Sequence, residues 1–320
     1  MKAIVARRLG GPEVLGLEQW PEPRPGPGEV RIRVVMAGVN FADTERRRGL
    51  HQAVGLPWIP GLEAAGFVDE IGKNVDASLV GRRVAFMATA TYAEATIVDA
   101  GALLLLPDSV GWEEAAAFPV QGLTAYHLLH AAARLGAGES VLVHAAAGGV
   151  GSWCVQMAAR AGARVFGTCS RPEKAAAVRA LGAEAVFLYG PNLAAIVREH
   201  TGGRGVDVVL DSVGRDTQET SLAVLAPFGR LIYFGEASGS PAPVDVGRLY
   251  EKSLQVGAYW LRTPHPRQLG REAAATLLEG LASGSLRAPA VRVFPLANAG
   301  EAHRALESRT TEGKLLLRVG

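Results

Sequence analysis

Between residues 140 and 260, short apolar runs alternate with segments of helical composition, and this rhythm constrains the fold more than any other sequence feature. The apolar runs predict strands at 140–146, 163–169, 184–189, 206–212, 229–235 and 254–260. The segments between the first four predict helices at 149–161, 172–181 and 191–200. Apolar strands separated by helices form βαβ units, whose strands lie parallel in one sheet. Six such strands make a complete Rossmann-type dinucleotide-binding sheet, so the fold class is α/β.

The N-terminal part has a different rhythm, in which short β-branched runs are separated by glycine- and proline-rich turns. Strands are predicted at 2–6, 29–37, 61–71, 83–86 and 92–98, which suggests a partly open β-barrel. After residue 260, a helix at 266–281, a helix at 298–307 and a strand at 314–319 are too little for a separate core. We therefore expect domains at 1–110 and 111–260, with residues 261–320 returning to the first domain.

The bulk composition of the 320 residues is that of an ordinary globular protein, with 48% hydrophobic and 20% charged residues. The formal net charge is only +2 and no basic stripe is present, so nucleic acid is not expected as a partner. The sequence contains neither a secretory signal nor an apolar run long enough to cross a bilayer, and no membrane association is expected. The only two cysteines, Cys154 and Cys169, lack a metal-type spacing, and we expect a cytoplasmic enzyme with reduced thiols.

A glycine-rich loop follows the strand at 140–146 and opens the next helix, which is the setting of a dinucleotide-binding fingerprint. Its spacing is Ala145-x-x-Gly148-x-x-Gly151, with alanine in place of the usual first glycine. Such a loop lets the backbone and the N–H groups of the helix N-terminus approach a pyrophosphate. The expected contacts are Ala147, Gly148, Gly149, Val150 and Gly151. The alternative is a glycine-rich turn without a ligand.

The end of the second strand of this sheet distinguishes NADPH from NADH. NAD sites usually place a carboxylate there to accept from the ribose 2′-hydroxyl. Here Ser170 and Arg171 occupy the position, and Lys174 follows one helical turn later. Because Arg and Lys complement a 2′-phosphate, the sequence favours NADPH. The alternative is that Arg171 and Lys174 are solvated surface charges.

Several segments that span nearly the whole chain resemble the zinc-free medium-chain dehydrogenases/reductases of the quinone oxidoreductase (zeta-crystallin-like) family. The resemblance implies a GroES-like catalytic domain and a Rossmann domain, with the active site in the cleft that they form. It also implies NADPH-dependent reduction of a quinone or another electron-poor alkene or carbonyl, and a homodimer joined at the sheet edge 254–260. The segments are KAIVARRLGGPEVL (2–15), GVNFADTERRRG (38–49), PGLEAAGFV (60–68), VQGLTAYHLL (120–129), HAAAGGVG (144–151), LDSVG (210–214) and HRALESRTTEGKLLL (303–317).

Further cofactor contacts follow from the resemblance, which matches individual positions of this chain to those that contact the cofactor in relatives. Where relatives often carry tyrosine in the cleft, this chain has Glu45, His51 and His127, so a more polar substrate pocket is expected. The expected contacts are Asn40, Thr124, Ser170, Lys174, Tyr189, Ser212, Val213, Phe234 and Gly235.

Three residues are candidates for the chemistry, each with a structural alternative. Asn40 is expected to anchor the nicotinamide ribose or the substrate oxygen, or else to hold a turn after a strand. Asp43 is expected to orient Arg47 or Arg48, or to form a structural ion pair. His127 is a possible proton donor, since its ordinary pKa lies near neutral pH, although a structural role on a helix face is the alternative.

No metal is expected in this chain. Zinc-using relatives carry Gly-His-Glu where this sequence reads Gly61-Leu62-Glu63, and leucine cannot bind a metal. No cysteine precedes Cys154, so the N-terminal region cannot supply three nitrogen or sulfur ligands.

Three functions remain open. The first is an NADPH-dependent quinone reductase. The second is an enone, alkenal or enoyl-thioester reductase, for which the run Arg46-Arg47-Arg48 would provide a basic pocket mouth. The third is a non-catalytic protein that binds NADPH.

Overall fold

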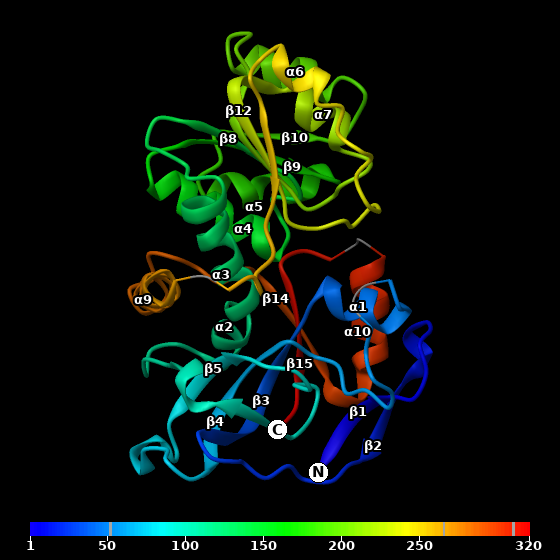
Figure 1. Cartoon of the computed structure of the whole chain (residues 1–320), viewed down its shortest axis with the longest axis vertical. Coiled ribbons are helices and arrows are strands. Elements are labelled where there is room, and N and C mark those ends of the chain that lie inside the picture. The colour runs from blue at the N-terminus through cyan, green and yellow to red at the C-terminus, as the bar shows by residue number, and fades with distance from the viewer. Residues whose placement is uncertain (51–52, 265, 309–310) are drawn as a thin grey trace. The chain divides into compact units, whose positions relative to one another are not determined.

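The computed structural model describes residues 1–50, 53–264, 266–308 and 311–320. The chain divides into two compact units, each of which is described here by itself (Figure 1). One consists of Met1–Val120 with Ala274–Gly320, and the other of Gln121–Ala273. The expected functional division at residues 110 and 260 stays a prediction.

The unit of residues 121–273 is built on a parallel sheet of six strands within the described residues, in the order β10-β9-β8-β11-β12-β13. Every pairing in it is parallel. Strand β8 lies beside both β9 and β11, so the strand order reverses direction there, as in a Rossmann sheet. The strands are β8 (Ser140–Val143), β9 (Arg164–Cys169), β10 (Ala185–Leu188), β11 (Val206–Asp211), β12 (Leu225–Tyr233) and β13 (Gln255–Ala258).

Helices connect these strands, and the central strands are buried because a parallel sheet is covered on both faces. Strand β8 has no exposed residue, and Leu142 packs with Phe166, Val209 and Leu231 in one core. The predicted helix that ends near residue 135 is shorter, since α3 ends at His127 and a π-helical turn covers Leu128–Ala132. The helices are α3 (Pro119–His127), α4 (Gly149–Arg160), α5 (Ala175–Ala180), α6 (Leu193–His200), α7 (Gln218–Ala223), α8 (Gly247–Tyr250) and α9 (Arg267–Ala282), with a 3-10 turn at Pro172–Lys174.

The other unit contains a sheet in the order β14-β15-β3-β4-β5-β7, with β6 paired to β3, and a separate β1-β2 hairpin. The C-terminal strand β15 pairs antiparallel with β3, so the end of the chain completes this sheet as expected. The strands are β1 (Lys2–Ala6), β2 (Leu15–Gln19), β3 (Glu29–Val39), β4 (Glu63–Ile71), β5 (Arg83–Met87), β6 (Ala95–Asp99), β7 (Leu104–Leu105), β14 (Val291–Pro295) and β15 (Lys314–Arg318).

Three helices accompany this second sheet, and its core joins residues far apart in the sequence. Ile32, Phe86, Phe294 and Leu315 belong to one buried cluster. The helices are α1 (Phe41–Arg48), α2 (Trp112–Ala116) and α10 (Ala299–Glu307), and 3-10 turns lie at Pro12–Val14, Ala77–Leu79, Ala100–Ala102 and Leu296–Asn298.

The predicted fold class, a six-stranded Rossmann sheet with a GroES-like β domain, is confirmed. Among the described residues, no helix is both long and apolar enough to cross a membrane.

Candidate functional site

The predicted cofactor residues of the Rossmann unit lie at one edge of its sheet, because each follows the carboxyl end of a parallel strand. Leu188 pairs with Cys169, so Tyr189 and Ser170 leave neighbouring strands at the same level. Asp211 pairs with Tyr233, which places Ser212 beside Phe234 in the same way. In open α/β sheets, ligands bind at this edge, near the point where the strand order reverses.

The glycine-rich loop presents unpaired backbone donors at this edge. Gly148 is the N-cap of α4 and provides no side chain to cap the helix. The N–H groups of Gly149, Val150 and Gly151 have no acceptor among the described residues. These groups and the positive end of the helix dipole fit a pyrophosphate.

The first position of the loop is held from outside. Ala145 has a φ of 49°, in the left-handed region that favours glycine. Its N–H donates to the Tyr189 hydroxyl over 2.8 Å, and the Tyr189 ring stacks on His144 with 5.8 Å between centroids. Burial raises the pKa of Tyr189 to about 12, so its hydroxyl stays protonated. Tyr189 therefore supports the loop at the residue that replaces glycine.

The residues that favour NADPH differ in exposure. Ser170 and Arg171 are exposed, whereas Lys174 is 7% exposed and lies in the 3-10 turn that begins at Pro172. Lys174 is therefore not a solvated surface charge. The carboxylate at Glu173, which would serve an NAD site, is exposed.

The loop that carries Ser212 and Val213 is shaped by the buried carboxylate of Asp211. Its Oδ1 accepts from the backbone N–H groups of Val213 (2.8 Å) and Gly214 (3.0 Å). Its Oδ2 accepts from the hydroxyls of Thr217 and Ser221, and Ser221 Oγ lies 3.1 Å from His144 Nε2. Burial lowers the pKa of His144, although the Asp211 charge opposes this shift. This network connects β8 and β11, the two strands on either side of the reversal point.

The remaining predicted residues of this unit lie on α3. Thr124 is 7% exposed and His127 is 1% exposed. His127 Nδ1 lies 2.6 Å from the hydroxyl of Tyr259, which follows β13. Burial raises the pKa of Tyr259 to about 12. The half-buried Tyr259 hydroxyl, and not the imidazole of His127, is therefore the more accessible end of this pair.

Asn40 and Asp43 come together in the other unit, at the N-terminus of α1. Asn40 is the N-cap, and its backbone N–H donates to Asp43 Oδ2 over 3.0 Å. Asp43 is fully buried, and its Oδ1 accepts from the N–H of Gly61 over 3.2 Å. Burial raises the pKa of Asp43 to about 6, while backbone N–H groups and Lys314 oppose the shift.

Asp43 does not orient Arg47 or Arg48 as expected, since Arg47 bonds elsewhere. Arg47 is 1% exposed and pairs with Glu307, while its Nε donates to the carbonyl of Gly10. Arg46 is 6% exposed and Arg48 is exposed. The expected basic surface at Arg46-Arg47-Arg48 is therefore wrong, because two of the three side chains are buried.

A chain of buried polar groups extends from Arg47 to Asp43. Arg47 Nη1 lies 3.4 Å from His303 Nδ1, and His303 Nε2 lies 3.2 Å from the hydroxyl of Tyr92. Arginine can only donate, so Nδ1 accepts and the proton of neutral His303 is on Nε2. That N–H donates to Tyr92, whose hydroxyl donates to Asp43 Oδ2 over 3.4 Å. Burial and the Arg47 charge lower the pKa of His303 to about 3.

Of the positions expected to make the pocket polar, Glu45 is half-buried and His127 is buried, while His51 lies outside the described residues. No group of three or more His, Cys, Asp or Glu side chains among the described residues is arranged to hold a metal ion.

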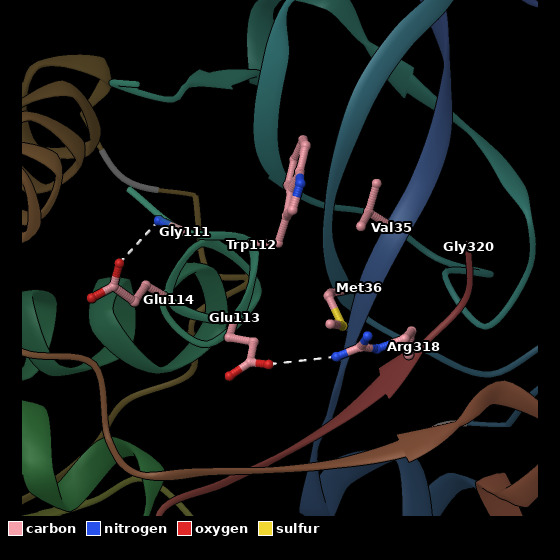
Figure 2. Close-up of a pocket in the computed structure, with 8 residues that line it drawn as sticks. All are labelled: Val35, Met36, Gly111, Trp112, Glu113, Glu114, Arg318 and Gly320. Carbon is pink, nitrogen blue, oxygen red and sulfur yellow. Dashed lines mark hydrogen bonds and ion pairs between the residues drawn. The ribbon is translucent and has the colours of Figure 1, made fainter. Parts of the chain in front are cut away.

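A separate pocket of about 470 Å³ lies in the GroES-like unit (Figure 2). Trp112 and Met36 line it, and Glu113 and Arg318 face each other across it with 3.7 Å between their charged atoms. None of the predicted site residues lines this pocket.

Two charged residues beside Asn40 were missed by sequence reasoning. Lys314 is 2% exposed, and its Nζ lies 3.0 Å from Asn40 Oδ1 and 2.5 Å from Glu63 Oε1. Glu63 is fully buried. The available signal is a lone charge at the start of a buried strand, since Glu63 begins β4 and Lys314 begins β15.

Comparison with known proteins agrees with this geometry. The alcohol dehydrogenase GroES-like domain matches residues 26–125, and the zinc-binding dehydrogenase domain matches residues 149–279. A quinone oxidoreductase of Pseudomonas aeruginosa is 41% identical over 99% of both chains. A 2-haloacrylate reductase of a Burkholderia species is 35% identical over 98% of both chains.

Solved structures give the same result. Escherichia coli quinone oxidoreductase complexed with NADPH superposes with a TM-score of 0.95 at 36% identity, covering 100% of both chains. The fold, the glycine-rich loop and the full-length similarity all agree. The chain belongs to the quinone oxidoreductase family of the medium-chain dehydrogenases/reductases.

Proposed function

We propose that this chain is an NADPH-dependent oxidoreductase that reduces a quinone without a metal ion. The observation that carries the proposal is the set of unpaired N–H groups at Gly149, Val150 and Gly151, with Lys174 and Arg171 beyond the next strand end. The loop donors fit the pyrophosphate, and the two cations fit a 2′-phosphate. The relatives named as quinone oxidoreductases support the acceptor.

Other residues of the chain have proposed roles on either side of the hydride transfer. When bound, NADPH supplies the hydride from its nicotinamide ring, and a quinone that accepts it also takes up a proton. Asn40 is proposed to contact the cofactor, and Asp43 holds the backbone of Asn40. The pair of His127 and Tyr259 is proposed to hold the proton, with the Tyr259 hydroxyl as its accessible end. Ser170, Thr124, Ala147, Gly148, Tyr189, Ser212, Val213, Phe234 and Gly235 complete the proposed cofactor contacts.

Zinc independence is part of the proposal and is supported by the donor set. Leu62 stands where zinc-using relatives carry histidine, and the neighbouring Glu63 is already paired with Lys314. A cytoplasmic location is also proposed, in keeping with Cys154 and Cys169 as free thiols.

A second candidate is the reduction of an electron-poor alkene, which the 2-haloacrylate reductase relative favours. In that reaction the hydride and the proton are both added across a carbon–carbon double bond. An enoyl-thioester substrate loses its main support, because Arg46 and Arg47 are buried and do not form a basic pocket mouth.

Oxidation of NADPH, followed by absorbance with a panel of quinones, 2-haloacrylates and enones, tests these functions. We expect turnover with quinones, and at least about tenfold weaker binding of NADH than of NADPH, because Lys174 and Arg171 would lose a charged partner. Turnover with the alkenes alone would favour the second candidate. Tight NADPH binding without turnover on any acceptor would indicate a non-catalytic protein.

A homodimer through β13 is proposed as well. Strand β13 is the edge of its sheet, and an open edge tends to pair with another strand. Large apolar side chains near this edge are exposed, namely Phe228, Tyr250 and Trp260.

The variant Ala258→Pro should convert the dimer to a monomer. The N–H of Tyr259 donates to β12, so alternation along the strand directs the N–H of Ala258 to the open edge. Proline removes that donor without affecting the pairing with β12. Light scattering measures the mass, and Ala258→Thr, which keeps the N–H, is the matched control. A proline variant that stays dimeric would contradict pairing at this edge.

A further inference from the structure

The side-chain amide of Asn40 is held by two charged groups inside the GroES-like unit. Its Nδ2 donates to Glu63 Oε1 over 3.0 Å and lies 3.5 Å from the carbonyl of Gly38. Its Oδ1 accepts from Lys314 Nζ over 3.0 Å. Lys314 also pairs directly with Glu63, so the three side chains form a closed triangle.

The charges in this triangle fix which end of the amide points where. An ammonium group can only donate hydrogen bonds and a carboxylate can only accept them. A flipped Asn40 would place its NH2 group against Lys314 and its oxygen against Glu63, which loses both bonds and adds two repulsive contacts. The orientation of this amide is therefore determined by its neighbours, which is unusual for asparagine.

The cost of the arrangement suggests that it serves more than stability. Asn40, Glu63 and Lys314 are 6%, 0% and 2% exposed. A buried ion pair is often no more stabilising than apolar residues of the same volume, because both charges lose their hydration. The second oxygen of Glu63 accepts from the backbone N–H of Val120 over 2.7 Å, so this carboxylate is fully engaged.

We propose that Lys314 and Glu63 are positioning residues that fix the amide of Asn40 for the nicotinamide end of the cofactor. Both N–H bonds of the amide point to Glu63 and Gly38, so the amide offers its carbonyl oxygen to an incoming group. A carbonyl oxygen selects a donor such as a ribose hydroxyl, and not a substrate oxyanion. This inference rests on the proposed NADPH dependence.

A charge-neutral double variant tests the positioning role. Lys314→Met together with Glu63→Gln removes both charges and leaves no unpaired buried ion, and an amide at position 63 accepts either orientation of Asn40. Calorimetry of the full chain is done with NADPH and with adenosine 2′,5′-bisphosphate, which lacks the nicotinamide ribose. We expect about tenfold weaker binding of NADPH and unchanged binding of the bisphosphate. Unchanged NADPH binding, or equal weakening of both ligands, would overturn the proposal.

A swap variant keeps the oxygen at position 40 and the charge of the cluster. Asn40→Asp with Glu63→Gln reverses the donor and acceptor between these two side chains while Lys314 stays beside both. NADPH binding within about threefold of the wild type is expected, because position 40 still presents an acceptor. A loss as large as that of the neutral variant would show that an N–H of Asn40 is needed, and would overturn its role as an acceptor.

These measurements need no turnover, so they separate this inference from the proposed function. A wild-type chain that binds NADPH but reduces no quinone leaves the inference in place. A wild-type chain that binds neither ligand refutes the proposed cofactor itself.

Discussion

Replacing Gly151 by alanine should weaken NADPH binding at least about hundredfold, which corresponds to about 2.7 kcal/mol. A Cβ at this position would lie 2.4 Å from the carbonyl oxygen of Ala145 and 2.8 Å from Cα of Ala146. Both are backbone atoms of the same loop, so the loop itself must shift. Alanine is the better helix former, so the loss does not reflect helix propensity. Calorimetric titration with NADPH measures the effect.

Two other glycines provide a graded control for this prediction. At Gly148, the nearest atom to an added Cβ is the Ala145 carbonyl oxygen at 3.1 Å, so Gly148→Ala should cost about tenfold. At Gly55 no atom lies within 4 Å, and Gly55→Ala should leave binding unchanged. If Gly151→Ala binds NADPH as tightly as Gly55→Ala does, the pyrophosphate does not sit on this loop.

The Rossmann sheet was predictable because its signals are local. Each strand is a short apolar run bounded by a helix, and parallel strands place their carboxyl ends at one edge. Ser170, Tyr189 and Ser212 could therefore be assigned to the same edge without knowledge of any distance. The return of the C-terminal strand was predictable for another reason, since the last sixty residues lack a core of their own.

The surroundings of Asn40 were not predictable, because the partners lie far apart in the chain. Lys314 contacts a residue 274 positions away, and Arg47 contacts Glu307 across 260 positions. Arg46-Arg47-Arg48 was interpreted as a solvated face, which is the usual place of a charge run. The sequence gave no sign that Glu307, His303 and the Gly10 carbonyl would satisfy Arg47 in the interior.

A similar limit applies to His127 and Asp43. Their residue types suggested proton transfer, but only the structure places Tyr259 between His127 and solvent-accessible space, and Gly61 and Tyr92 against Asp43. Hydrogen-bond partners from other elements decide whether a titratable group is exposed or held, and they follow from packing and not from spacing.

The buried His303 should make the stability of the chain depend on pH. Its folded pKa is about 3, whereas an unfolded histidine has a pKa of about 6.5. Between these values the unfolded chain binds a proton that the folded chain does not, so stability falls as the pH falls below about 6.5. Each pH unit in this window costs about 1.4 kcal/mol. Asp43 acts in the opposite direction between about 4 and 6, because its folded pKa is raised to about 6.

The variant His303→Gln isolates this contribution, because glutamine can accept from Arg47 and donate to Tyr92 without binding a proton. Urea unfolding from pH 7 to pH 4 should show wild-type stability falling more steeply, by about 1.4 kcal/mol per pH unit at pH 4 to 6. Asp43 is present in both proteins, so its opposite effect cancels in the difference. The exposed His200, replaced by glutamine, should give a curve parallel to the wild type. Parallel curves for His303→Gln and the wild type would mean that His303 is protonated in the folded chain, which would break the directed hydrogen bonds from Arg47 to Asp43.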